Sequence, residues 1–191
     1  SQMKNKIWDF VKPIVVLTVI AAVMAALLGG TNLLTKAKIE SLAAANEKAA
    51  VEKVIKAEKY EKLALDYEGS EYTYFLVKNN GEKAGYAFTL SQNGYGGAVN
   101  LVVGIGTDGK ITAIEITDVS NETPGLGQNA VKPSFTDQFK GKDSSLTVTK
   151  SGAKGNEVNA ITGATITSKA VTKSVNLAMD LFKYIEKDGG E

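Results

Sequence analysis

The sequence of 191 residues contains neither cysteine nor histidine. Without cysteine, the chain cannot form a disulfide, a thiol nucleophile or a thiolate-ligated iron–sulfur cluster. Without histidine, it also lacks the side chain that most often acts as an acid or base near neutral pH, and a usual zinc ligand. These absences exclude zinc sites built from His and Cys and acid–base catalysis by histidine. We expect no metal site and no catalytic residue in this chain, so any redox chemistry must be carried by an organic cofactor or a partner protein.

The charges are almost balanced, so a strong excess of one sign is missing as well. Lysine and arginine number 22 and aspartate and glutamate 21, which gives a formal net charge of +1. Because nucleic-acid-binding domains need a clustered basic excess, we expect no nucleic-acid partner. The length and an ordinary hydrophobic share of 43% indicate one globular domain with appendages.

Residues 13–35 form a long run without a single charge. About 20 mostly apolar residues suffice for a helix to cross a bilayer, and Trp8 suits the membrane interface. Lysines outnumber acidic residues ahead of the run. The positive-inside rule therefore predicts a single-pass helix in the cell (inner) membrane, with residues 1–12 in the cytoplasm and the rest of the chain on the outer side. Two alternatives stay open: a cleaved signal peptide and a buried core helix.

Residues 36–62 are predicted to form a helical connector that leads to a soluble domain of residues 63–191. The stretch from Lys36 to about Tyr60 is rich in Ala, Glu and Lys, has no Gly or Pro, and repeats its apolar residues at roughly helical spacing. A solvated spacer is the alternative for its outer face.

The soluble domain is expected to be α+β, with a mainly antiparallel sheet and a packing helix at the C-terminal end. Aromatic and β-branched content between turn signals predicts strands at residues 72–78, 84–90, 98–105, 110–117 and 146–149, and a short helix at 133–139. The last helix has the clearest pattern, because its apolar residues recur in steps of three and four along one face: Val171, Val175, Ala178, Phe182 and Ile185.

Residues 159–168, Asn-Ala-Ile-Thr-Gly-Ala-Thr-Ile-Thr-Ser, stand directly before this helix. Their hydroxyl groups, a glycine that lets the backbone approach a ligand, and the unpaired N–H groups of a helix start together suit a phosphate. The same residue types are also the usual helix N-caps, and physical chemistry alone favours capping over phosphate binding. The segment matches neither the P-loop nor the Gly-x-Gly-x-x-Gly pattern.

Three motifs resemble those of covalent FMN-binding domains. They are Thr162-Gly163-Ala164-Thr165, Gly94-Tyr95-Gly96-Gly97, and Glu122-Thr123-Pro124-Gly125-Leu126-Gly127. That family includes the G subunit of Rnf-type electron-transport complexes and the C subunit of the sodium-translocating NADH:quinone reductase. The resemblance implies that a flavin transferase moves FMN from FAD onto the hydroxyl of Thr165, through a phosphoester.

The resemblance also implies which residues bind the cofactor: Thr162, Gly163, Ala164, Glu122, Thr123, Leu126, Gly127 and Tyr95. The loop of residues 122–127 would wrap the flavin, with Glu122 and Thr123 as hydrogen-bond partners and Leu126 over a ring face. Tyr95 would stack on the ring. Two simpler interpretations stay open, because Pro124-Gly125 is sufficient for a plain turn and Tyr95 for a packed surface aromatic.

As a whole, the resemblance implies an electron-carrying flavoprotein subunit, not an enzyme by itself, of a membrane-bound Rnf-type ferredoxin:NAD oxidoreductase coupled to ion transport. Its partners would be the other membrane subunits and, for maturation, the flavin transferase. The length of 191 residues favours the Rnf-type G subunit over the usually longer C subunit of the quinone reductase. A third hypothesis is a stand-alone extracellular flavin reductase. A fourth is a non-redox anchored binding domain that has lost the flavin. Asn159 motivates it, because the family usually has Asp at that position.

Overall fold

The computed structural model describes residues 2–188, without the side chains of residues 2–10, 33–34, 37 and 39–40. The interfacial position predicted for Trp8 lies outside this description. Two compact units divide the chain, residues 1–45 and residues 46–191.

The first unit consists of the greater part of helix α1, Gln2–Val54. One segment of α1, Val11–Asn32, has a mean hydropathy of 2.5 and is long and apolar enough to cross a membrane. It overlaps the span predicted over residues 13–35 and fits a single-pass membrane anchor.

The second unit is built on a five-stranded antiparallel sheet in the order β1-β2-β3-β4-β5, so that each strand pairs with its neighbour in sequence. Tight turns join the strands, and Gly81 and Gly109 take positive φ angles of 81° and 76° at two of them. The Asn80-Gly81 and Asp108-Gly109 pairs at these turns are among the turn signals that bound the predicted strands. The strands span Lys59–Tyr67, Ser70–Asn79, Glu82–Asn93, Ala98–Gly106 and Ile111–Asp118.

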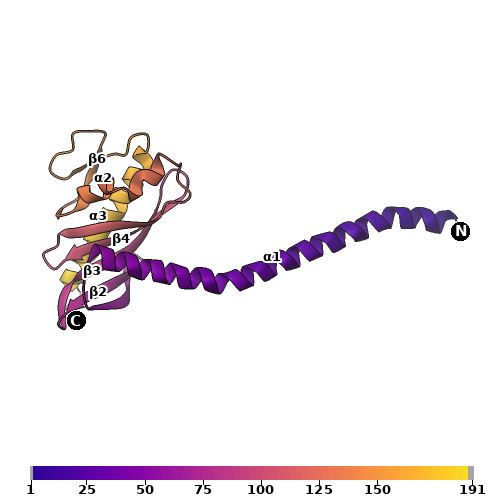
Figure 1. Ribbon diagram of the computed structural model, residues 1–191, viewed down its shortest axis with the longest axis horizontal. Helices are drawn as coiled ribbons and strands as arrows, with labels where there is room; N and C mark the ends of the chain where they lie inside the picture. Colours follow the sequence, from indigo (N-terminus) through magenta and orange to yellow (C-terminus); the bar gives the residue numbers. More distant parts are fainter. Residues whose placement is uncertain (1, 189–191) are drawn as a thin grey trace. The chain divides into compact units, whose positions relative to one another are not determined.

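Short elements follow the sheet and lead to the long C-terminal helix α3, Thr165–Asp188. Strands β6, Thr147–Thr149, and β7, Glu157–Asn159, form a separate parallel pair. The short helices are η1 (Gly127–Val131), α2 (Pro133–Thr136) and η2 (Asp137–Phe139). Figure 1 shows α3 lying along the sheet beside β4.

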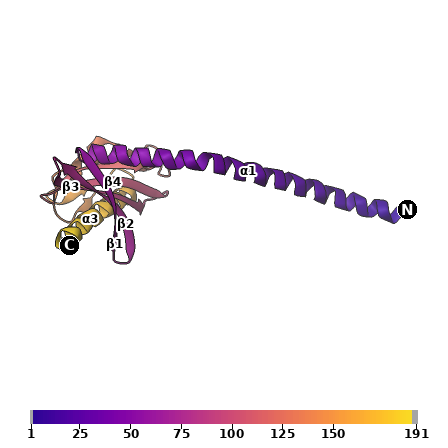
Figure 2. The same cartoon turned by 90° about the horizontal axis from the view of Figure 1, so that it is seen from below.

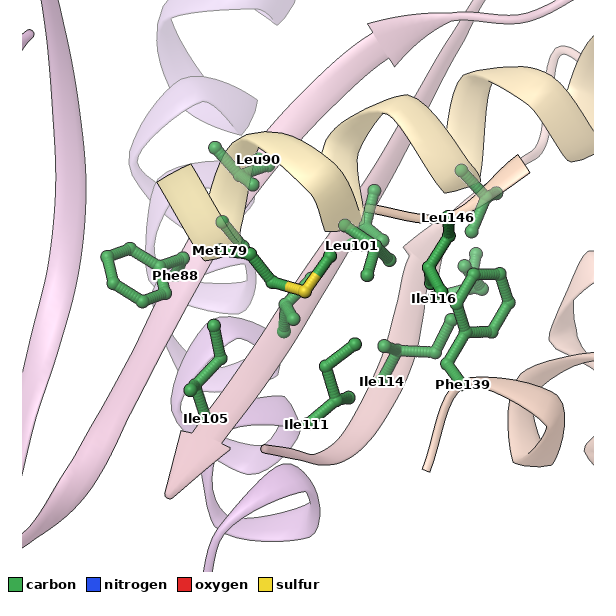
Figure 3. Packing of buried hydrophobic residues seen from close by; sticks show 14 of the residues in the cluster. Phe88, Leu90, Leu101, Ile105, Ile111, Ile114, Ile116, Phe139, Leu146 and Met179 are labelled. Carbon is green, nitrogen blue, oxygen red and sulfur yellow. The ribbon is translucent and has the colours of Figure 1, made fainter. Parts of the chain in front are cut away.

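The sheet is covered on both faces. Against one face packs α3, whose predicted apolar stripe is buried or, at Phe182, partly buried. Against the other face pack the last turns of α1, through Ala50, Val51 and Val54 (Figure 2). Figure 3 shows the larger core, in which Met179 of α3 lies among aliphatic and aromatic side chains of the strands.

The end of α1 approaches the sheet closely because Gly104 of β4 has no side chain. A Cβ at this position would stand 2.8 Å from the carbonyl oxygen of Val54. The same carbonyl accepts a 2.5 Å hydrogen bond from Oγ1 of Thr112 on β5. The final turn of α1 is therefore fixed to the centre of the sheet and belongs to the folded domain.

The α+β architecture is confirmed, but the predicted extent of the connector helix is wrong at its C-terminal end. The helix expected to reach about Tyr60 ends at Val54, and Lys59–Tyr67 is an edge strand that the sequence pattern missed. Lys, Glu, Leu and Ala favour helix, yet tertiary pairing with β2 outweighs that preference here. Strand β7, only three residues long, was missed as well.

Replacing Leu101 by alanine is expected to destabilise the domain by about 2–5 kcal/mol, because this fully buried side chain lies in the main core cluster and its loss leaves a cavity. The matched control is Lys150→Ala at an exposed position, which should change stability by no more than about 0.5 kcal/mol. Thermal unfolding followed by circular dichroism measures both. Equal melting temperatures for the two variants would contradict this packing.

Candidate functional site

One pocket of about 550 Å³ brings together the three sequence motifs. It lies where the loop after β5 meets the start of α3, with the turn between β3 and β4 beside them. Its size falls within the usual range for small-molecule and cofactor sites. The residues that line it are Tyr95, Glu122, Thr123, Leu126, Gly127, Gly163, Ala164, Thr165, Ile166 and Thr167.

Glu122 joins these segments, because its carboxylate is bonded to two of them. Only 2% of the residue is exposed. Oε1 accepts a 2.9 Å hydrogen bond from the backbone N–H of Gly96, and Oε2 accepts one of 2.5 Å from the hydroxyl of Thr167 on α3. A buried carboxylate needs such partners to remain charged. Glu122 therefore fixes the first turn of α3 to the β3–β4 turn.

The glycines of the motifs make room for this carboxylate. A Cβ at Gly94 would overlap Oε1 of Glu122, and a Cβ at Gly127 would overlap Oε2. At Gly96 a Cβ would overlap the backbone oxygen of Asn121. The glycine-rich pattern thus reflects close packing of backbone around one acidic side chain, in addition to turn geometry.

Helix α3 begins at Thr165, and hydrogen-bond donors in its first turn have no partner in the described part of the protein. Within the described residues, no hydrogen bond engages the backbone N–H groups of Thr165, Ile166 and Thr167, or the Thr165 hydroxyl. Ser168, a candidate cap, instead accepts from the N–H of Ile161 and donates to the oxygen of Ala164, at 2.9 Å each. The helix start therefore offers free N–H groups and the positive end of its dipole, which suit an anion.

Apolar side chains form the outer part of the pocket. Tyr95 is 73% exposed, Ile166 53% and Leu126 41%. Leu126 packs over Gly163, whose φ of 75° requires glycine and whose missing side chain leaves room for the Leu126 Cδ2 atom. A pocket with an apolar mouth and polar donors at one end can accept a flat aromatic ligand that carries a phosphate.

The structure places every predicted site residue on this pocket except Thr162. That residue is exposed and lines a neighbouring pocket of about 620 Å³. Two lining residues, Ile166 and Thr167, were not among the predicted site residues. Ile166 could have been identified from the sequence, because it is an apolar residue that lies off the buried stripe of α3. Thr167 could not, because its hydrogen bond to Glu122 joins positions 45 residues apart and has no local sequence signal.

Asn159, which stands where an Asp was expected, has a structural role at the end of β7. Its Oδ1 accepts a 3.0 Å hydrogen bond from the N–H of Ala153. Its backbone is bonded to the side chain of Gln138 in both directions. Asn and Asp can both accept the bond from Ala153, so the segment ahead of the Thr162–Thr165 motif keeps its shape with asparagine.

The comparisons with known proteins agree with this geometry. An FMN-binding domain family matches residues 94–180. The chain is 40% identical to the G subunit of the Na(+)-translocating ferredoxin:NAD(+) oxidoreductase complex of Acetobacterium woodii, over 90% of this chain and 91% of that protein. It is 35% identical to the G subunit of the ion-translocating oxidoreductase complex of Methanosarcina acetivorans, over 90% and 94%.

A solved structure shares the fold. NqrC of Shewanella oneidensis superposes with a TM-score of 0.51 at 21% identity, over 57% of this chain and 55% of that one. The match over residues 94–180 assigns an FMN-binding domain, which follows the candidate membrane anchor in the sequence. By its relatives, the chain belongs to the family of G subunits of ion-translocating oxidoreductase complexes.

The shifted pKa of Glu122 makes the stability of the folded domain depend on pH. Burial alone would raise this pKa, but hydrogen bonds from Thr167 and from the backbone of Gly96, Tyr95 and Gly97 hold it below the ordinary value of 4.5. Since the folded pKa is the lower one, the stabilisation is complete above pH 4.5 and is lost as the pH falls through the folded pKa.

We therefore expect Glu122→Gln to lower stability at pH 7 by about 1–3 kcal/mol, because weaker neutral hydrogen bonds replace the charge-assisted ones. The difference in melting temperature between this variant and the parent should narrow below pH 4.5, where the parent carboxylate becomes protonated. Thermal melts across this pH range test it. A difference that stays constant or widens on acidification would contradict an ionised Glu122.

Proposed function

We propose that this chain carries FMN on Thr165 through a phosphoester and serves as an electron-carrying subunit of an Rnf-type ferredoxin:NAD oxidoreductase complex coupled to ion transport. The observation that carries the proposal is the start of α3, where the unbonded Thr165 hydroxyl and three free backbone N–H groups lie on the pocket. Similarity to G subunits of such complexes supports the assignment to the complex.

The residues present fit FMN. The N–H groups of Thr165, Ile166 and Thr167 can hold the phosphate, because they are unpaired and stand at the positive end of a helix. Leu126, Tyr95 and Ile166 offer apolar contacts for the ring system. The bound FMN would supply the redox chemistry that this chain, without cysteine or histidine, cannot supply with its own side chains.

Attachment requires one bond to form and one to break. The Oγ of Thr165 bonds to the phosphorus on the FMN side of the FAD pyrophosphate, and the P–O bond to the AMP side breaks, so AMP leaves. The hydroxyl proton would pass to a base on the flavin transferase, because among the described residues that line the pocket Glu122 is the one carboxylate and there is no lysine. Glu122 is itself bonded to Thr167 and Gly96.

The complex proposed here is membrane-bound, and α1 anchors the flavin domain on the outer side of the membrane with the N-terminus in the cytoplasm. The electron partners are the other membrane subunits. A covalent link suits this location, because a dissociated flavin would be lost to the bulk solvent outside the cell.

The intact mass of the denatured chain tests the attachment. Produced together with a flavin transferase, the parent should gain the mass of FMN less one water, and Thr165→Ala should gain nothing. Thr165→Ser, which keeps a hydroxyl at the same position, should still be modified, because the reaction uses the oxygen. An added mass on Thr165→Ala, or none on the parent, would refute the proposed site.

The orientation can be tested in a chain that has no native cysteine. Single variants Lys150→Cys, at an exposed position of the flavin domain, and Gln2→Cys, ahead of the anchor, are treated with a membrane-impermeant maleimide in right-side-out vesicles. We expect labelling of Lys150→Cys alone, and of both after detergent is added. Labelling of Gln2→Cys alone before detergent would reverse the proposed orientation.

A further inference from the structure

We propose that the buried carboxylate of Glu122 is a fixed negative charge that lowers the reduction potential of the flavin bound in the pocket. This inference rests on the proposed function, since it needs FMN on Thr165. It assigns to Glu122 an electrostatic role toward the cofactor, through its charge rather than through a hydrogen bond to it.

The position of the charge is fixed by the protein. Glu122 lines the same pocket as Thr165, yet it is only 2% exposed and its two oxygens are bonded to Gly96 and Thr167. Gly94 and Gly127 have no side chain that would overlap these oxygens. Burial and the two hydrogen bonds therefore hold the carboxylate in place, and among the described residues that line the pocket there is no other carboxylate and no lysine.

A charge in this position acts strongly on an added electron. Coulomb interactions between buried groups are weakened less by water and salt than those at the surface. An electron that enters the pocket adds negative charge beside the carboxylate, so its arrival costs energy and the reduction potential falls. Hydrogen bonds from Thr167 and Gly96 disperse the charge but do not remove it. Proteins tune the reduction potential of a flavin partly by placing charged groups near it.

The first test compares full-length, detergent-solubilised parent and Glu122→Gln, each loaded by the transferase and checked by intact mass. Gln keeps the size, can accept from Gly96 and can donate to Thr167, so it removes the charge and preserves the contacts. Spectroelectrochemical titration at about pH 8, well above the ordinary pKa of a glutamate, should give a higher reduction potential for Glu122→Gln. Glu122→Asp, which keeps the charge and disturbs the packing, should stay closer to the parent than Glu122→Gln does.

For a second variant we expect the reduction potential to shift in the opposite direction. This test does not depend on whether Glu122→Gln folds. Thr167→Val keeps the shape of a fully buried residue but removes the 2.5 Å hydrogen bond to Oε2. With less of the charge dispersed, the potential should fall below that of the parent. A merely structural role for Glu122 would shift both variants in the same direction or not at all.

The outcomes separate this inference from the function on which it rests. Loaded variants with a raised potential for Glu122→Gln and a lowered one for Thr167→Val support the inference. Loaded variants with unchanged potentials, or with Glu122→Asp shifted as far upward as Glu122→Gln, overturn it and leave the covalent flavoprotein in place. A parent that carries no FMN by intact mass refutes the proposed function instead.

Discussion

The carboxylate of Glu122 holds together parts of the chain that no local pattern would bring into contact. Gly96 lies in the turn between β3 and β4, Thr167 lies in the first turn of α3, and Glu122 itself follows β5. A buried carboxylate whose partners are removed is left with a large desolvation penalty, so these two bonds strongly favour a single arrangement of the three segments. The pocket on Thr165 is a consequence of that arrangement, since the residues that line it belong to the same segments.

This constraint explains why the first turn of α3 is available to a ligand. A helix start is usually capped by its own Ser or Thr, and this one has several candidates. Each hydroxyl is engaged otherwise or left free. The Ser168 hydroxyl bonds to Ile161 and Ala164, the Thr167 hydroxyl donates to Glu122, and the Thr165 hydroxyl makes no hydrogen bond within the described part of the protein. The hydroxyls of Thr167 and Ser168, which could have capped the helix, thus bond to other groups, and the first N–H groups of the helix stay open.

Much of the fold could be predicted from the sequence, because its signals are local. The stripe of α3 and the turns at Gly81 and Gly109 are short-range patterns, and strands β2 to β5 were located within a few residues. Strand β1 could not be predicted from the sequence, since its residues favour helix and only pairing with β2 makes this segment extended. At the site, resemblance located the motifs, whereas physical chemistry alone favoured a capped helix. The bond between Glu122 and Thr167 is non-local and needed the fold.

The shape of the pocket also bears on why the proposed covalent link would be useful. Its mouth is formed by side chains that are partly in solvent, Tyr95 and Ile166 above all, so the walls do not enclose a ligand. The buried charge of Glu122 gives no attraction to a phosphate or to a reduced ring. Non-covalent binding in such a site pays the full entropy of association with few compensating contacts. The proposed bond to Thr165 would make ring docking intramolecular and would raise the effective concentration of the ring at the pocket. The walls would then be free to keep an exposed edge and a negative charge, which suit the electron transfer proposed for this site.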